Sequence, residues 1–450
     1  MRLLFTVVLS AGCLAGCAVH TISAPSVRGH MDFLASDAMN GRGSGTRDEW
    51  IAATYIASQL RRWGLEPLGD HDDFVQAIEI SRMQVTAPPV LTADALRLTH
   101  GKELIVQGLG ALHVSGPLRK FHPGAAIAPG DVVLMPDGPL SREAAEVYGI
   151  AAAVLNVENA QSRSRWDVQA GRPILLPGRI VALPAPAGGR AQVSRITLDA
   201  RAHVEMSAMA DGTVVSLEAT GAEVRSHTWN AVGRLKGSDP TMSNDAILLT
   251  AHLDHLGGNG SGADKIFNGA DDDASGSAAV LELAEALAKG KRTKRTVIFA
   301  WFGSEEAGGY GARYFVERPP VPLEHMIANL EFEMIGRADK AVAAHTLWLT
   351  GYERTNLGPE LARRGARIVA DPHPDQNFFE RSDNIVLARK GVVAQTVSSY
   401  GLHTDYHQPS DDVAHLDVAH MTESIRSMLK PVLWLANGTF APAWRPGKRP

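Results

Sequence analysis

The stretch ILLTAHLDHLG (residues 247–257), continued by IFNGADDDASGSAAVLELAEALA (266–288) and TVIFAWFGSEEAGGYG (296–311), decides the fold. Each of its three apolar segments carries acidic or imidazole side chains at one end. An open α/β sheet binds its ligands at the carboxyl ends of its strands. We therefore predict an α/β fold with its chemistry in this stretch.

The first segment places a histidine and an aspartate at a strand end. Residues 247–250 form a short apolar run typical of a strand, which gives way abruptly to His252 and Asp254. Asp254 would project on the same side as His252 if the chain stays extended. A carboxylate there can accept the other ring N–H of a metal-bound histidine and fix its tautomer.

The second segment places three carboxylates, Asp271 to Asp273, just before a helical pattern that Gly290 ends. Three adjacent negative charges repel one another, so a cation or a helix N-terminus is expected nearby. The third segment, residues 296–302, predicts a strand and leads to Glu305 and Glu306. Paired glutamates at a strand end suit two tasks, because one can bind a metal while the other moves a proton.

Each signal alone has an ordinary explanation. A single histidine can be structural, an acidic triplet can be a solvated turn or a helix cap, and paired glutamates can lie on the surface. In this order, and each after an apolar run, the three signals together favour a metal-dependent site.

These motifs resemble those of peptidase family M28, the co-catalytic zinc peptidases. Five pieces occur in the family's order: AHLDHLG (251–257), NGADDDASG (268–276), FGSEE (302–306), NLEFEMIGR (329–337) and LHTDYHQPSDD (402–412). The resemblance covers residues 228–412, and more loosely 27–76. It implies the zinc exopeptidase fold, with a mixed, mostly parallel central sheet and helices on both faces.

The resemblance also implies the metal ligands. Two Zn²⁺ ions would be bound, one by His252 and Glu333 and the other by Glu306 and His407, with Asp272 bridging them. The family usually has aspartate where this chain has Glu333, which is one methylene longer and still an oxygen ligand that zinc accepts. His255 and His403 are expected to be second-shell or surface residues rather than ligands.

The same resemblance implies the catalytic roles. Glu305 would be the general base, Tyr406 would help to stabilise the oxyanion, and Asp254 would support His252. The implied activity is that of an aminopeptidase, which removes N-terminal residues from peptides by metal-activated water. Two alternatives stay open: a single-zinc enzyme similar to glutaminyl cyclases, and a non-catalytic binding protein similar to the transferrin receptor.

Composition limits the partners. The chain has 450 residues and a formal net charge of −5, with no basic block beyond residues 289–295, so nucleic-acid binding has no electrostatic support. Peptides are the expected partners. The sequence does not determine the side-chain preference or the oligomeric state.

The first residues predict export. Arg2 followed by a short apolar core is typical of a signal peptide, and Leu14 to Cys17 resembles a bacterial lipoprotein cleavage box. Lipid on Cys17 would be the chain's link to a membrane, and we expect it to lie in the outer membrane facing the periplasm. Ordinary secretion with cleavage elsewhere is the alternative.

The chain is long enough for two domains. We predict a signal peptide (1–16), an N-terminal part of the catalytic domain (17–77), an inserted β-rich α/β domain (78–225), the main catalytic domain (226–440) and a mobile tail (441–450). The insertion shows a βαβ pattern over residues 131–155 that resembles a protease-associated domain.

Overall fold

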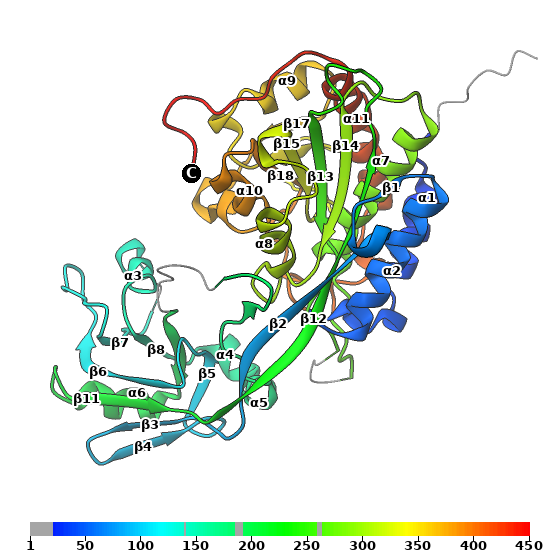
Figure 1. Cartoon of the computed structure of the whole chain (residues 1–450). Coiled ribbons are helices and arrows are strands. Elements are labelled where there is room, and N and C mark those ends of the chain that lie inside the picture. The colour runs from blue at the N-terminus through cyan, green and yellow to red at the C-terminus, as the bar shows by residue number, and fades with distance from the viewer. Residues whose placement is uncertain (1–20, 139–140, 185–191, 259–262) are drawn as a thin grey trace, which may run out of the picture.

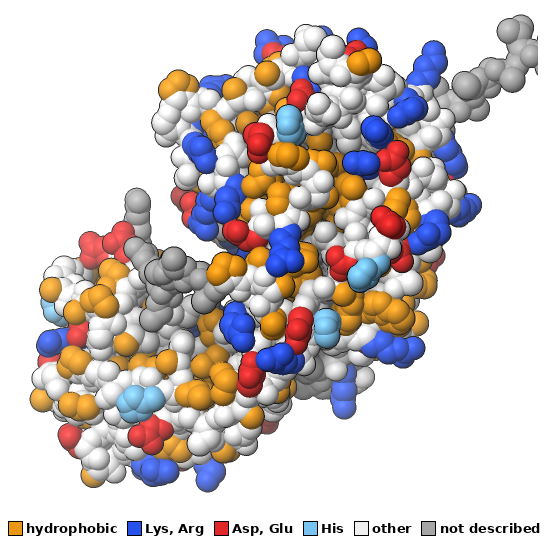
Figure 2. Space-filling view, viewed as in Figure 1, with side chains coloured by type: hydrophobic (Ala, Val, Ile, Leu, Met, Phe, Trp, Pro, Cys, Tyr) orange, Lys and Arg blue, Asp and Glu red, His pale blue; other side chains and the backbone are white. Residues whose placement is uncertain are grey.

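The structure is a computed structural model that describes residues 21–138, 141–184, 192–258 and 263–450. Two lobes, each built on its own sheet, are joined by two long antiparallel strands, β2 (Val75–Val85) and β12 (Gly221–Leu235) (Figure 1). On the face shown in Figure 2, basic and acidic side chains are mixed across both lobes. Within the described residues, no helix has the length and apolar character needed to cross a membrane.

The larger lobe contains a ten-stranded mixed sheet within the described residues. Its strands lie in the order β17 (Ile368–Ala370), β16 (Leu347–Leu349), β18 (Ala394–Ser398), β15 (Met326–Phe332), β13 (Ala246–His252), β14 (Thr296–Phe302), β12, β2 and β9 (Arg179–Ile180), with β1 (Glu66–Pro67) paired to β12. The pairings β18–β15, β15–β13 and β13–β14 are parallel. Strand β14 has the predicted bounds, and the predicted α/β class is confirmed.

Helices cover both faces of this sheet. On one face, α1 (Ala24–Leu34), α2 (Arg47–Arg62), α7 (Gly276–Lys289), α9 (Leu357–Arg363) and α11 (Val418–Asn437) bury alternate strand residues such as Leu249 and Phe299. On the other, α8 (Tyr310–Glu317) and α10 (Asn384–Lys390) pack on the intervening residues, such as Leu248 and Ile298. Side chains of a strand alternate between faces, so a strand buried on both sides is continuously apolar.

The smaller lobe is an eight-stranded sheet in the order β4 (Leu96–Thr99), β3 (Val90–Ala93), β11 (Val214–Glu218), β6 (His113–Lys120), β7 (Val132–Leu134), β8 (Ala153–Val157), β10 (Ser194–Leu198) and β5 (Leu104–Gly108). It carries α3 (Arg142–Val147), α4 (Ala160–Ser164), α5 (Trp166–Gly171) and α6 (Ala200–Ala208). Strands β7 and β8 pair in parallel on either side of α3 in the chain, which is the βαβ arrangement expected there.

Three expectations have distinct outcomes. Cys17 and the predicted signal peptide lie outside the described residues. Thr46 and Glu49 have the sequence spacing of a capping box, which predicts the start of α2. The box is half formed: the Thr46 hydroxyl accepts the N–H of Glu49, but the Glu49 side chain accepts the N–H groups of Gly45 and Ser304. The C-terminal segment lies against the larger lobe, where the indole N–H of Trp444 donates to the Gly391 carbonyl.

Candidate metal centre

Four adjacent strands bring the predicted site residues to one edge of the larger sheet. Strand β13 ends at His252. Strand β14 ends three residues before Glu305, and β15 ends one residue before Glu333. The loop after β18 carries His407. Because β18, β15, β13 and β14 run parallel, their carboxyl ends lie side by side, and residues more than 150 positions apart in sequence meet there.

Two groups of side chains at this edge have the geometry of metal ligands. His252, Asp272 and Glu333 form one group; His255, Asp272, Glu306 and His407 form the other, and in each the ligand atoms lie within 4.8 Å of one another. All five ligands that the family resemblance implies lie in these groups. Asp272 belongs to both, which is the arrangement that a shared carboxylate ligand requires.

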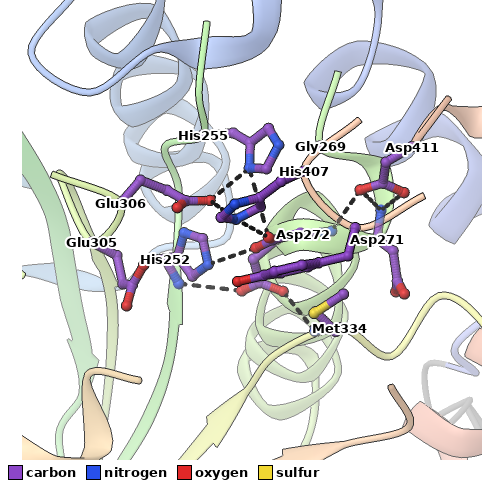
Figure 3. Close-up of polar contacts among 12 residues, drawn as sticks. His252, His255, Gly269, Asp271, Asp272, Glu305, Glu306, Met334, His407 and Asp411 are labelled. Atoms are coloured by element: carbon purple, nitrogen blue, oxygen red, sulfur yellow. Dashed lines mark hydrogen bonds and ion pairs between the residues drawn. The ribbon is translucent and has the colours of Figure 1, made fainter. Parts of the chain in front are cut away.

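The contacts within the groups are close without being good hydrogen bonds. His252 Nε2 lies 3.2 Å from Asp272 Oδ1, and His407 Nε2 lies 3.1 Å from both Asp272 Oδ2 and Glu306 Oε1 (Figure 3). Yet the two histidine Nε2 atoms and Glu306 Oε1 are buried without an aligned hydrogen-bond partner. Buried polar atoms need partners, and atoms that converge on a common point without bonding one another fit around a cation. Nitrogen and carboxylate oxygen are ligands that zinc accepts.

His255 is the residue that sequence reasoning assigned to the periphery. It is fully buried, and its Nδ1 lies 2.9 Å from Glu306 Oε1 and 3.9 Å from Asp272 Oδ2. The signal was the HLDH spacing itself: His252 ends β13, His255 follows three residues later, and both side chains are buried. His403, its counterpart in that expectation, lies outside both groups and contacts Asp271 Oδ2 at 2.9 Å.

The three consecutive aspartates make different contacts and have different roles. Asp272 faces the two ligand groups (Figure 3). The Asp273 carboxylate accepts the N–H groups of Gly276 at the start of α7, of Met334 and of His252. It therefore fixes the backbone next to His252 and Glu333, two of the implied ligands. The predicted helix N-terminus near this acidic run is α7, and it contacts Asp273.

Asp271 and Asp411 hold the other side of the acidic turn. Asp271 Oδ1 accepts the N–H of Gly336 at 2.6 Å. The Asp411 carboxylate accepts the N–H groups of Asp271 and Asp272 at 3.0 and 3.1 Å. These bonds fix the position of Asp272, the residue common to both groups, which is the supporting role that outer carboxylates have in metal sites.

A buried arginine ties the N-terminal loop to the centre. Arg42 is 1% exposed, and its guanidinium donates to the carbonyl groups of Leu34, Leu253, Asn268 and Gly269. Leu34 ends α1, Leu253 follows β13, and Asn268 and Gly269 precede the acidic turn. The loop at residues 40–45 therefore supports the centre directly.

Glu305 lies beside the two groups, and Asp254 positions it. Asp254 Oδ1 accepts the Glu305 backbone N–H at 3.0 Å and Oδ2 accepts the Ser44 hydroxyl. Asp254 Oδ1 lies 3.7 Å from His252 Nδ1, too far for a hydrogen bond. The expected direct bond between Asp254 and His252 is thus absent in this structure, and the observed bond of Asp254 orients the glutamate loop instead.

Burial and charge act against each other on these groups. Burial raises the pKa of Glu306, but His255 and His407 outweigh it and hold that pKa at about 2. Burial lowers the pKa of His407, but Asp272 and Glu306 raise it to about 10. For Glu333 burial is reinforced by Glu331, and its pKa rises to about 8. The pKa of Glu305 also rises, through burial and through the nearby Asp383 and Glu306.

An aromatic pocket adjoins the centre. It is lined by Glu333, Trp348, Phe378, Tyr400 and Tyr406 among others. The Tyr406 ring stacks on the ring of His407 with centroids 3.9 Å apart. Glu333 thus belongs both to a ligand group and to the wall of this pocket, so a molecule bound there would lie beside the centre.

The fold and the site define a class: an α/β protein with a buried histidine–carboxylate centre at the carboxyl edge of its sheet. Residues 230–432 match the sequence model of Peptidase family M28, so this part of the chain is similar to that family. The family resemblance drawn from the five motifs is confirmed.

Individual relatives agree over part of the chain. An aminopeptidase of Pseudomonas aeruginosa (strain UCBPP-PA14) is 36% identical over 115 residues, which is 25% of this chain and 19% of the relative. Leupeptin-inactivating enzyme 1 of Streptomyces exfoliatus is 36% identical over 110 residues, 24% and 23% of the two chains. The chain therefore spans about a fifth of the length of these curated relatives.

Solved structures match over nearly the whole chain. The aminopeptidase from Aneurinibacillus sp. strain AM-1 superposes with a TM-score of 0.60 at 19% identity, covering 95% of this chain and 96% of that one. BSAP, a zinc aminopeptidase from Bacillus subtilis, gives a TM-score of 0.57 at 18% identity, covering 93% and 97%. At these identities the match shows a shared fold, including the smaller lobe.

Proposed function

We propose that the protein is a di-zinc aminopeptidase that removes N-terminal residues from peptides. The observation that carries this proposal is the pair of ligand groups sharing Asp272, with Glu305 outside both and next to them. His252, Asp272 and Glu333 would hold one ion, and Asp272, Glu306 and His407 the other, with His255 within reach of the second. Bound zinc would polarise the scissile carbonyl and make water acidic enough to attack near neutral pH.

The residues of the chain supply the proton transfers. The Glu305 carboxylate would accept the proton of the attacking water and return it to the leaving amine. Burial is the largest cause that raises the pKa of Glu305, and a raised pKa makes a carboxylate a stronger proton acceptor. The Tyr406 hydroxyl group, on a ring held by stacking on His407, would donate to the developing oxyanion.

The aromatic pocket suits the substrate's N-terminal residue. Glu333 in the wall of this pocket offers carboxyl oxygens that can accept hydrogen bonds from an α-ammonium group. Trp348, Phe378 and Tyr400 provide an apolar wall for the side chain of that residue. We therefore expect substrates with a free amino terminus and an apolar first residue.

The test is hydrolysis of leucine p-nitroanilide by the purified full chain, before and after chelation and with zinc added back. We expect activity that chelation removes and zinc restores, and no cleavage of the N-acetylated anilide. In Glu305→Gln, kcat should fall about 10²–10⁴-fold with unchanged zinc content. Substantial remaining turnover in that variant would remove Glu305 from the general-base role.

Metal analysis separates this proposal from its alternatives. Two zinc ions per chain support the di-zinc enzyme, whereas one ion together with cyclisation of N-terminal glutamine would support a glutaminyl cyclase-like enzyme. A chain that binds zinc and cleaves neither anilides nor peptides would support a non-catalytic binding protein.

We also propose that the chain is exported and anchored by lipid at Cys17, on the strength of residues 2–17. Expression of the full chain in a Gram-negative host should place it in the membrane fraction, and Cys17→Ser should move it to the soluble periplasmic fraction. Equal membrane association of both proteins would contradict the lipid anchor.

A further inference from the structure

A second pocket opens on the metal centre from the side of the smaller lobe. We call it the interlobe pocket; Arg165, Gln169 and Arg172 line it from the smaller lobe, and Leu256, Phe267 and His407 from the larger one. Arg165 follows α4 and Arg172 follows α5, the two short helices that lie where the lobes meet (Figure 1). The smaller lobe thus reaches the group that contains His407.

Two guanidinium groups face this pocket without a carboxylate to match them. Among the described residues, neither Arg165 nor Arg172 has an acidic side chain within ion-pair distance. Arg172 lies over the ring of Phe267, with its Cζ 5.5 Å from the centroid. This cation–π contact occupies the face of the guanidinium, but Arg172 Nε is buried and has no hydrogen-bond partner. Burial, and then repulsion by Arg165, lower the pKa of Arg172.

Two like charges held together at a partly buried site favour an anion between them. Arginine is suited to carboxylates, because its planar fork of N–H groups matches both oxygens. Phe267 precedes the ligand turn by a few residues and is 5% exposed, so Arg172 is held against a rigid part of the centre. The pocket therefore has the charge, the donors and the support of a carboxylate subsite.

The positions of the two pockets relative to the centre indicate which end of a bound peptide each pocket would hold. Tyr406 lines the aromatic pocket and its neighbour His407 lines the interlobe pocket, so the two pockets flank the His407 side of the centre. The proposed function places the N-terminal residue of a peptide in the aromatic pocket, which has one carboxyl group, Glu333, and one guanidinium, Arg381, whereas the interlobe pocket has two arginines and attracts an anionic end. A bound peptide would therefore run from the aromatic pocket to the interlobe pocket.

We infer that Arg165 and Arg172 form a subsite for a carboxylate on the leaving side of the scissile bond, so that the preferred substrates are short peptides whose C-terminal carboxylate follows within one or two residues. This inference rests on the proposed aminopeptidase function. An aspartate or glutamate side chain just past the scissile bond offers the same chemistry, and the test distinguishes the two sources.

The test compares kcat/KM for Leu-Gly, Leu-Gly-amide and Leu-Asp-amide with the zinc-loaded full chain. We expect Leu-Gly to exceed Leu-Gly-amide by about tenfold, the effect of one charge-assisted hydrogen-bonded pair. A similar advantage of Leu-Asp-amide over Leu-Gly-amide would assign the subsite to an acidic side chain. Equal values for all three substrates would overturn the inference.

Variants connect the preference to the arginines. In Arg165→Gln and in Arg172→Gln the ratio of Leu-Gly to Leu-Gly-amide should fall toward one, and Arg165→Lys should keep part of it. Arg163→Gln is the matched control, because Arg163 lies on α4, pairs with Glu158 and does not line the pocket, and it should keep the wild-type ratio. A ratio unchanged in both pocket variants would overturn the inference.

A binding measurement keeps this test separate from the proposed function. With Glu305→Gln, calorimetry should show tighter binding of Leu-Gly than of Leu-Gly-amide, and the added Arg165→Gln should remove the difference. If the wild-type chain hydrolyses none of the peptides, the proposed function fails, and this binding difference still decides the inference. Equal binding of acid and amide contradicts the subsite.

Discussion

Two buried clusters of histidine and carboxylate in the larger lobe respond to burial in opposite ways. Between α1 and α7, His30 Nε2 lies 3.7 Å from Glu282 Oε1. There burial lowers the pKa of His30 to about 4 and raises that of Glu282 to about 7, so the neutral forms are favoured. At the metal centre the pKa of His407 is about 10 and that of Glu306 is about 2, so both are charged.

The number of partners explains the difference. His30 and Glu282 face one another at a distance too long for a hydrogen bond, and the His30 ring instead bonds the Tyr55 hydroxyl. A lone pair at that separation does not recover the cost of desolvation. At the centre each charged group has several partners of opposite charge, and their sum exceeds that cost. The charges of the neighbouring groups, rather than burial, therefore set the pKa values of His407 and Glu306.

The largest expected effect comes from the shared carboxylate. Asp272→Asn removes a charged ligand from both groups, so the zinc affinity of each should fall by more than the 10–100-fold typical of losing an outer partner. Zinc content after dialysis against weak chelator measures this. Asp271→Asn is the control, because Asp271 bonds the Gly336 N–H and the His403 ring and belongs to neither group. Equal zinc loss in the two variants would contradict the different roles of Asp271 and Asp272.

Removing the buried cation beside the centre should destabilise the chain next most strongly. Arg42→Met leaves four buried carbonyl groups without their donor and the nearby carboxylates without a positive neighbour, so the free energy of unfolding should fall by about 3–5 kcal/mol. Urea unfolding measures this. Arg61→Met, which removes an exposed ion pair to Asp73, should change stability by under about 1 kcal/mol. Similar losses in both variants would refute the role of Arg42.

The contribution of the His30–Glu282 pair to the free energy of unfolding should depend on pH. Because the pKa of Glu282 is about 7 when folded and 4.5 in its ordinary state, its stabilising term is present below pH 4.5 and is lost as pH rises through 7. His30, with a pKa lowered to about 4, contributes in the opposite direction, since its term is lost as pH falls through 4. The difference in unfolding free energy between the wild type and a Glu282 variant isolates the contribution of Glu282.

We expect the free energy of unfolding of Glu282→Gln, taken relative to that of the wild type, to be higher at pH 8 than at pH 5 by roughly 3 kcal/mol. Urea unfolding at the two pH values measures this difference. The groups acting on Glu282 besides His30 are Ser26, Glu285 and Lys289, all retained in the variant. Glu324→Gln at an exposed position serves as control. If the difference in unfolding free energy between variant and wild type does not change between pH 5 and pH 8, Glu282 is ionised in the folded chain, as Glu306 is at the metal centre.

The smallest effect separates His255 from the other ligands. His255→Gln should weaken binding of one of the two zinc ions by about 10–100-fold and leave the other unaffected, because His255 lies in the second group alone. Competition with a chelator, followed ion by ion, measures this. His227→Gln at an exposed position is the control, and undiminished affinity for both ions would return His255 to a supporting role.

Prediction from the sequence succeeded where a local pattern fixes a local structure. The apolar run at 296–302 is β14, and the pattern that ends at Gly290 is α7. It failed where a side chain had two possible partners. Glu49 has the spacing of a capping box, yet it bonds Ser304, which lies 255 positions away. No spacing within the sequence contains that partner.

By itself, the sequence determined the α/β class, the resemblance to family M28 and the order of the segments that carry the site residues, because the apolar periodicity and the motifs are properties of neighbouring residues. The tertiary structure alone decided that His255 turns into the second ligand group, that Arg42 ties three segments together and that Arg165 and Arg172 reach the centre from the other lobe. Those outcomes depend on which strand ends lie side by side and on how the lobes meet, and distances across the fold are set by packing rather than by position along the chain.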